Sequence, residues 1–193
     1  LFNQANNVYV GGKIKKICIP NHYDYKHYRL NPTAVKLLFK EKGWEKIIAF
    51  QTRNPLHRAH VEMISKSMDD LDAQLLLHPV VGQTKVGDID YHTRVRCYEH
   101  IIKKYLKGSS VLALLPLAMR MAGPKEALLH AIIRRNFGCT HIIIGRDHAG
   151  PGKDMKGNLF YDPYAAQNLL KEHEDEINIK IVSFKLMVYV PEK

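Results

Sequence analysis

The sequence predicts an α/β fold: a Rossmann-like, doubly wound domain with a mostly parallel five-stranded sheet and helices on both faces. Short apolar segments alternate with segments of helical pattern along most of the chain, as in successive right-handed βαβ units. The apolar segments are continuous and do not alternate with polar residues, as expected for strands that are covered on both faces. A length of 193 residues suits one such domain with a short appendage.

Five apolar segments are expected to form the strands of this sheet. In chain order they cover residues 46–50, 73–81, 111–117, 141–145 and 177–184. Each is rich in Ile, Leu, Val or Phe, and a longer segment of helical pattern separates it from the next. If the strands follow the common order 3-2-1-4-5, the first and fourth strands are neighbours at the centre of the sheet.

The helical segments complete the alternation. They cover residues 55–68, 91–106, 123–138 and 162–174, and a lead-in helix is expected over 29–44. Gly138 is expected to close the helix at 123–138. Residues 1–28 are interpreted as a connector or as the tail of a preceding domain, and residues 29–193 as the main domain. The first residue is Leu1 and no signal-peptide pattern follows, so we expect a piece of a longer protein.

The composition limits the classes of function. The formal net charge of +10 would suit nucleic-acid binding, a small anionic substrate or a solvated basic surface. No apolar run reaches the roughly 18–20 residues that span a bilayer, so no membrane role is expected. Cys18, Cys97 and Cys139 are far apart, which argues against a disulfide framework or a thiolate zinc site and favours a reducing, cytoplasmic compartment.

The segment QTRNPLHRAH (51–60) joins the first predicted strand to the first predicted helix. Ligands of open α/β sheets bind at the carboxyl ends of strands, and a helix N-terminus there favours phosphate. Pro55 would stand at the start of the helix, with His57 and His60 on one face of its first turn. The two imidazoles could donate to charge developing on a phosphate. The alternatives are surface histidines or half of a metal site, although the Glu of an H-E-x-x-H motif is absent.

The segment GRDHAG (145–150) follows the fourth predicted strand. Gly145 and Gly150 permit close approach to the backbone, and Arg146 offers a planar set of donors for phosphate. If the first and fourth strands are neighbours, this segment and QTRNPLHRAH face the same crevice. The alternative is a turn in which Asp147 caps a helix.

These motifs carry a resemblance to a known family. PLHRAH resembles the H-x-x-H signature of nucleotidyltransferases, which act at the α-phosphate of a nucleotide. QTRNPLHRAH and GRDHAG are both similar to the active-site loops of ATP sulfurylases, and the similarity runs from about Val10 to Pro191. The segment FKLMVYVP is similar to the family's FRMVTYLP but differs within it, next to Met187.

The resemblance implies the reaction of ATP and sulfate to adenosine 5′-phosphosulfate (APS) and pyrophosphate, with Mg²⁺ bound to ATP and no metal held by the protein. Residues 29–193 would then be a nucleotide-binding adenylyltransferase catalytic domain. A homo-oligomer is expected from the family, with no nucleic-acid or membrane partner. The alternatives are a related H-x-x-H adenylyltransferase with a different small acceptor, a nucleic-acid-binding module and a scaffold.

The resemblance also implies roles for matching residues. Sulfate would contact Gln51, Arg53 and the backbone N–H of Ala149. The catalytic residues would be Thr52, Arg53, Asn54, His57 and His60. The residues that bind ATP would be Gln51, Thr52, Arg53, Asn54, His57, His60, Gly145, Arg146, Asp147, His148 and Met187. Phe184 matches a position linked to ATP-dependent changes in substrate recognition, and Arg120 would support the anion site or form a structural ion pair.

Overall fold

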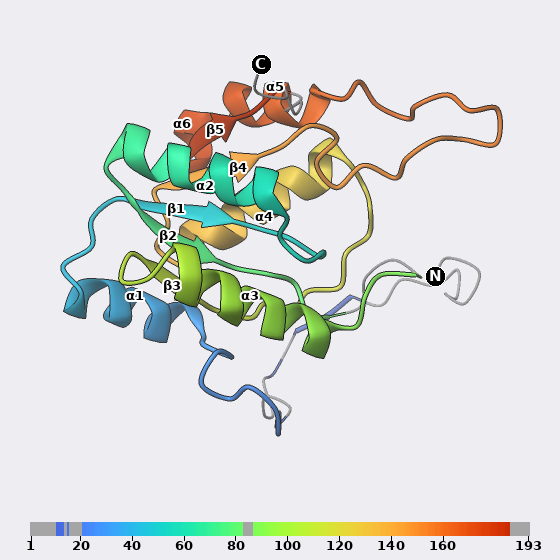
Figure 1. Cartoon of the computed structure of the whole chain (residues 1–193). Coiled ribbons are helices and arrows are strands. Elements are labelled where there is room, and N and C mark those ends of the chain that lie inside the picture. The colour runs from blue at the N-terminus through green and yellow to red at the C-terminus, as the bar shows by residue number, and fades with distance from the viewer. Residues whose placement is uncertain (1–10, 14, 16–20, 83–86, 186–193) are drawn as a thin grey trace, which may run out of the picture.

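A five-stranded sheet in which all neighbouring strands are parallel forms the centre of the structure (Figure 1). The computed structural model describes residues 11–13, 15, 21–82 and 87–185. The strands are β1 (Ile47–Phe50), β2 (Gln74–Leu77), β3 (Ser110–Leu112), β4 (His141–Ile144) and β5 (Lys180–Ser183). Their order is β3-β2-β1-β4-β5, so the predicted fold and the adjacency of the first and fourth strands are confirmed.

Helices cover both faces of this sheet. They are α1 (Pro32–Glu41), α2 (Arg58–Leu71), α3 (Tyr91–Tyr105), α4 (Pro124–Asn136), α5 (Ala165–Glu172) and α6 (Glu174–Ile177). Residues of α1, α4 and α5 share one buried apolar cluster with Ile47 and Ala49 of β1. Residues of α2 and α3 share the other with Ile48 and Phe50, because successive side chains of a strand point to opposite faces. Within the described residues, no helix is both long and apolar enough to cross a membrane.

The strands β2 and β3 are shorter than predicted, although the chain stays extended beyond them. The backbone N–H of His78 donates to the carbonyl of Phe50, and that of Val80 donates to Thr52. Val80 also forms an isolated parallel bridge with Leu115. The apolar residues that follow the ladders therefore continue the packing of the sheet toward its carboxyl edge.

The C-terminal part of the chain also differs from the prediction. The predicted helix over 162–174 is shorter, because the side chain of Asp162 accepts from the backbone N–H of Tyr164 and holds a turn there. The separate helix α6 follows and ends at Ile177, and its C-cap Asn178 has a positive φ of 52°. The last strand consequently begins at Lys180 and not at residue 177.

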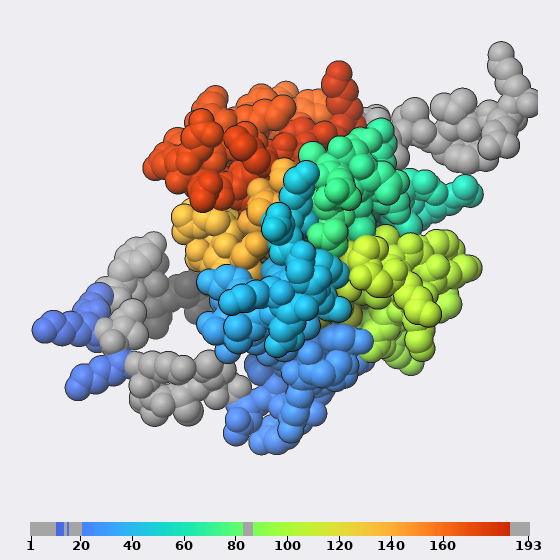
Figure 2. Space-filling view, turned by 90° about the vertical axis from the view of Figure 1, so that its left-hand side faces the viewer, coloured from blue at the N-terminus to red at the C-terminus, as the bar shows by residue number. Residues whose placement is uncertain are grey.

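The two edges of the sheet carry different segments. Figure 2 shows the molecule from the side of the amino ends of the strands, with the chain near α1 (blue) at the bottom, the C-terminal elements (red) at the top and the end of α4 (orange-yellow) between them. The loops after β1 and β4 extend from the opposite, carboxyl edge (Figure 1). Both predicted motifs are on these loops.

Candidate active site

The loops that follow β1 and β4 line a common cavity of about 240 Å³ at the carboxyl edge of the sheet. Residues 50–54 and His60 contribute one wall, and residues 147–150 contribute another. Met119 and Met121, from the segment before α4, complete the lining. The structure thus brings together two motifs that are about ninety residues apart in the sequence.

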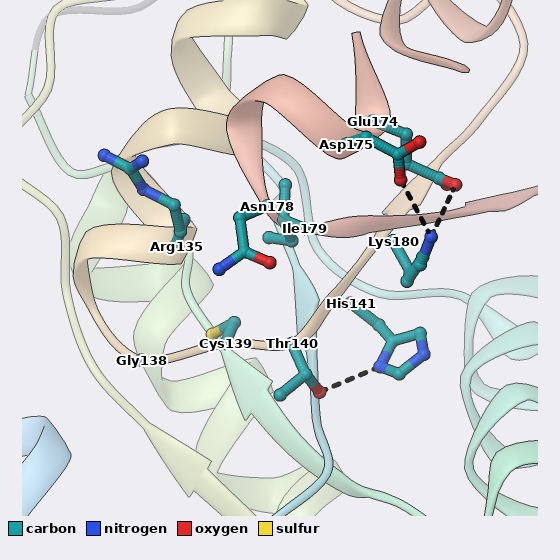
Figure 3. Close-up of a pocket in the computed structure, with 10 residues that line it drawn as sticks. All are labelled: Arg135, Gly138, Cys139, Thr140, His141, Glu174, Asp175, Asn178, Ile179 and Lys180. Atoms are coloured by element: carbon teal, nitrogen blue, oxygen red, sulfur yellow. Dashed lines mark hydrogen bonds and ion pairs between the residues drawn. The ribbon is translucent and has the colours of Figure 1, made fainter. Parts of the chain in front are cut away.

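A larger cavity, of about 400 Å³, lies at the amino ends of β4 and β5 (Figure 3). Three of its charged groups are engaged with one another: Lys180 donates to the carboxylates of Glu174 and Asp175. It contains neither motif, and ligands of open α/β sheets bind at the opposite, carboxyl edge. The smaller cavity is therefore the candidate active site.

A hydrogen-bonded turn shapes the beginning of the first motif. Thr52 Oγ1 accepts from the backbone N–H of Asn54 at 3.0 Å and lies 2.8 Å from the carbonyl oxygen of Asn54. The hydroxyl of Tyr98, on α3, donates to the same carbonyl at 2.8 Å. Tyr98 is fully buried, so α3 holds this turn in place from the protein interior.

Because the chain turns here, the helix begins later than predicted. It starts at Arg58 and not at Pro55, with His57 as the N-cap and His60 as the third helical residue. Pro55 is therefore in the loop, and the prediction that both histidines belong to the first helical turn is wrong for His57.

The two histidine rings are nevertheless stacked. Their centroids are 4.1 Å apart, and the backbone N–H of His57 points at Nδ1 of His60 from 3.5 Å. Since Nδ1 is the acceptor, the ring proton of neutral His60 is on Nε2. Burial, and then the charge of His57, lower the pKa of His60, so the ring is neutral at pH 7. His60 lines the cavity as a neutral donor, whereas exposed His57 lies outside its lining.

Arg53 points its guanidinium at Asp88, a residue in the loop before α3. Both side chains are mostly buried, with 22% and 11% exposed. A guanidinium has five N–H donors, so Arg53 can keep its bond to Asp88 and still offer others to an anion. The ion pair fixes the direction of the side chain at the edge of the cavity.

The second motif forms a strained loop. Asp147 has a φ of 52° and Ala149 a φ of 56°, and Met121 on the facing segment has a φ of 55°. Non-glycine residues rarely adopt such angles, and they concentrate at functional sites. The carbonyl of Ala149 accepts from Gly123 N–H at 2.9 Å, whereas the N–H of Ala149 has no acceptor among the described residues. The carboxylate of Asp147 lies over Gly150, where any side chain would collide with it.

A sequence model of the ATP-sulfurylase family matches residues 26–193, which is most of the chain. The chain belongs to the ATP-sulfurylase family. Sulfate adenylyltransferase of Schizosaccharomyces pombe is 54% identical over 193 residues, and that of Saccharomyces cerevisiae is 52% identical over 193 residues. Both alignments cover 100% of this chain but only 39% and 38% of the relatives, so the chain spans about two fifths of their length.

A solved structure is similar in fold. The hexameric APS kinase from Thiobacillus denitrificans aligns with a TM-score of 0.70 and 33% identity. The alignment covers 89% of this chain and 31% of that chain. The family model and the sequence relatives confirm the resemblance to ATP sulfurylases that the two motifs suggested.

Most of the site residues expected of an ATP sulfurylase line the cavity. They are Gln51, Thr52, Arg53, Asn54, His60, Asp147, His148 and Ala149. Gly145 and Arg146 are at the end of β4 but outside the lining, and Met187 lies outside the described residues. Asp147 does not cap a helix, because the N-cap of the next helix is Tyr164.

Two further positions are placed by the structure. The side chain of Arg120 is exposed, and its backbone N–H donates to Glu126 at 2.8 Å, so the contact to Glu126 is made by the backbone. Phe184 packs against the α2–α3 face of the sheet. Its carbonyl accepts from the side chain of buried Gln167 at 2.8 Å, which fixes the end of β5.

The sequence did not single out a layer of buried polar side chains behind the cavity. His130 and Arg134 of α4 are both fully buried, and Glu126 is 5% exposed. Burial, with the charges of His148 and Arg134, lowers the pKa of His130 to about 2, and burial lowers that of His148 to about 4. Both imidazoles are therefore neutral at pH 7.

Arg134 brings a positive charge into this layer. Burial lowers its pKa to about 9, so the guanidinium is still protonated at neutral pH. It donates to the carbonyls of His78 at 3.1 Å and His130 at 3.4 Å, and within the described part of the chain it forms no ion pair with an Asp or Glu. Positive charge in a poorly solvated region favours an anion in the adjoining cavity.

Proposed function

We propose that the protein containing this chain is a sulfate adenylyltransferase. A sulfate oxygen attacks the α-phosphorus of ATP, the bond from that phosphorus to the bridging oxygen of the β-phosphate breaks, and APS and pyrophosphate are released. The observation that carries the proposal is the shared cavity. In this member of the ATP-sulfurylase family, the segments QTRN (51–54) and DHAG (147–150) line that cavity together.

The groups around the cavity suit two anions. Arg53 supplies a fixed guanidinium, and Ala149 supplies a backbone N–H that the described residues leave free. With the amide of Gln51 they would form the sulfate site. Repulsion between sulfate and the α-phosphate is the main obstacle to this reaction, and fixed donors reduce it without reorganising.

The remaining residues would bind and activate ATP. Thr52 and Asn54 surround the position proposed for the α-phosphate, and neutral His60 would donate its Nε2–H to charge that develops on pyrophosphate. His57 is stacked on His60 and lies outside the cavity lining, and from there it would help to stabilise the same charge on pyrophosphate. Sulfate is already ionised at neutral pH, so no side chain has to remove a proton from it.

The nucleotide would extend from the cavity over the loop after β4, toward Gly145, Arg146 and His148. Met187, outside the described residues, is proposed as a further ATP contact. A cavity of 240 Å³ is smaller than the roughly 300–1,000 Å³ of most small-molecule sites, which fits the reacting groups and leaves the base outside. Mg²⁺ would arrive as MgATP and neutralise phosphate charge. Among the described residues no group of three or more His, Cys, Asp and Glu is arranged to hold a metal ion.

Several broader expectations also stay proposals. We propose a domain boundary near residue 28, a cytoplasmic location and a homo-oligomer. The solved relative is described as hexameric, which supports the last of these.

The reverse reaction provides the test, because formation of ATP from APS and pyrophosphate is the favourable direction. The full-length protein with Mg²⁺ should produce ATP, and an Arg53→Ala variant should lose at least about 100-fold in kcat/KM, as expected when a charged donor to the reacting groups is removed. Arg58→Ala is the matched control, since Arg58 is exposed and outside the cavity lining. A folded, full-length protein that makes no ATP would refute the proposal. Inhibition by molybdate or selenate would separate sulfate from a different acceptor.

A further inference from the structure

The side-chain amide of Gln51 lies between the cavity and helix α4. Its Nε2 is 3.5 Å from Nε2 of His130 and 4.0 Å from Sδ of Met119. Its Oε1 is buried and has no hydrogen-bond partner among the described residues. In this orientation the end of the amide that faces away from His130 is an acceptor, which is the wrong polarity for an oxyanion. Sulfate and phosphate oxygens only accept hydrogen bonds.

The surroundings of His130 indicate where its single ring proton is held. Oε1 of Glu126, one turn earlier on α4, is 3.6 Å from Nε2 of His130. The backbone N–H groups of Arg120 and Ala122 donate to this carboxylate at 2.8 and 2.9 Å and hold it in place. A fixed negative oxygen beside Nε2 favours an N–H there over a lone pair.

With the proton on Nε2, the other nitrogen of His130 must be an acceptor. Nε2 of His148 lies 3.1 Å from Nδ1 of His130, at hydrogen-bonding distance. The two rings are neutral, as burial requires, so His148 donates through Nε2 and His130 donates through its own Nε2. On this side the Gln51 amide is 3.5 Å from Nε2, slightly nearer than the Glu126 carboxylate at 3.6 Å, and it can accept the bond through its oxygen.

We infer that Glu126 and His130 are positioning residues, which turn the Gln51 amide so that its oxygen accepts from His130 and its NH₂ group faces the bound oxyanion. The donors then run in one direction, from His148 to His130, from His130 to Gln51, and from Gln51 to sulfate. A half-turn of the amide exchanges its oxygen and nitrogen without any backbone movement, and it replaces the unpaired acceptor with N–H donors that the bound oxyanion would pair. This inference rests on the proposed function, since it assigns a sulfate contact.

Two substitutions of His130 distinguish the contact made by Nε2 of its ring from the contact made by Nδ1. The terminal amide of Gln in His130→Gln places a donor near the position of Nε2, so it retains the contact to Gln51. The shorter Asn in His130→Asn places its amide near Nδ1, so it retains only the contact to His148. Both remove the imidazole from the same buried position.

The KM for sulfate and the KM for ATP should be measured for both variants of the full-length protein. His130→Asn is expected to raise the KM for sulfate about tenfold, as expected for losing a buried hydrogen bond of about 1.4 kcal/mol, with a smaller change for ATP. His130→Gln is expected to stay within about threefold of the parent for sulfate. His100→Asn, at an exposed position of α3, is the control and should change neither constant. Equal effects of Asn and Gln on sulfate would overturn the inference.

The tautomer can be measured on the parent protein, so the test does not depend on either variant folding. Ring ¹⁵N chemical shifts distinguish a protonated from an unprotonated nitrogen, and loss of signals in His130→Gln assigns them. A proton on Nε2 of His130 is expected, and a proton on Nδ1 would overturn the inference even if the enzyme is active. A parent protein without ATP-forming activity would instead refute the proposed function.

Discussion

Arg53 and Asp88 form an ion pair across the edge of the candidate site, although 35 positions separate them in the sequence. The carboxylate and a bound oxyanion would both be acceptors for the same guanidinium. Asp88 therefore fixes the direction of the Arg53 side chain. Its negative charge would also weaken the attraction of Arg53 for a bound oxyanion. The two effects have separate consequences in an Asp88→Asn variant.

Asp88→Asn should lower kcat about tenfold, because the loss of a fixed partner leaves Arg53 without one defined position. Affinity for a competing oxyanion should be unchanged or higher, because a negative charge has been removed from the edge of the site. Steady-state kinetics with an oxyanion inhibitor measure both quantities. An unchanged kcat would show that Asp88 does not position Arg53.

The hydroxyl of Tyr98 supports the turn between Thr52 and Asn54 from the buried side. Tyr98→Phe should lower the free energy of unfolding by about 1 kcal/mol, the usual net contribution of one such bond, and should reduce kcat several-fold. Tyr105→Phe is the matched control, since Tyr105 is on the same helix and is 55% exposed. Urea unfolding and kinetics on both variants test the prediction, and a fully active Tyr98→Phe variant would contradict it.

Two glycines, in the loops that follow β2 and β4, are expected to respond differently to alanine. A Cβ on Gly82 would be 2.4 Å from the carbonyl oxygen of Leu117, which is backbone and cannot easily move. Gly82→Ala should therefore cost about 2–4 kcal/mol of stability, in the range of severe overpacking.

A Cβ on Gly145 would meet nothing within 4 Å. Gly145→Ala should change stability by less than about 1 kcal/mol, and it should weaken ATP binding if the nucleotide passes close to this backbone. Urea midpoints and the KM for ATP distinguish the two glycines. Equal destabilisation of both variants would contradict the assigned contacts.

Stability should fall as the pH is lowered below about 6.5. Burial lowers the pKa of His78, His130 and His148 in the folded protein, whereas in the unfolded chain these groups have ordinary values near 6.5. The unfolded state therefore binds more protons below that pH, and each histidine contributes up to about 1.4 kcal/mol per pH unit. The contribution of these histidines to the free energy of unfolding is fully present above pH 6.5. It is lost as the pH falls toward the pKa values of the folded state, about 4 for His148 and about 2 for His130.

Urea unfolding at pH 7.5, 6.5 and 5.5 tests this expectation, because few carboxyl groups titrate in that range. A flat dependence would contradict the neutral state of the three rings in the folded protein. The variant His148→Asn should reduce the slope.

The fold and the place of the cavity could be predicted because both follow from local patterns. Continuous apolar segments such as residues 141–145 identify strands buried on both faces, and the strand order then brings 51–60 and 145–150 together. The start of α2 could not be predicted, because it depends on hydrogen bonds of Thr52 and on Tyr98 from a different helix.

The buried polar layer could not be predicted either. Glu126 and His130 are one turn apart in a segment whose helical pattern was recognised, but only the packing of α4 shows that this face is buried. A charged residue at helical spacing from a histidine is ordinarily solvent-exposed. Asp88 follows no periodic pattern, so its contact with Arg53 is visible only in three dimensions.

The pairing of β1 with β4 has a kinetic consequence. Ile48 pairs with His141 and Ala49 with Ile142, so the contacts that bring the two site loops together close a segment of more than ninety residues. Contacts of such long sequence separation form late, because the entropy of closing the loop opposes them. The helices and the β1–β2 pair can form before the two walls of the candidate active site come together. During refolding, ligand binding should consequently lag behind the helical circular-dichroism signal, and it would report the last long-range step of folding.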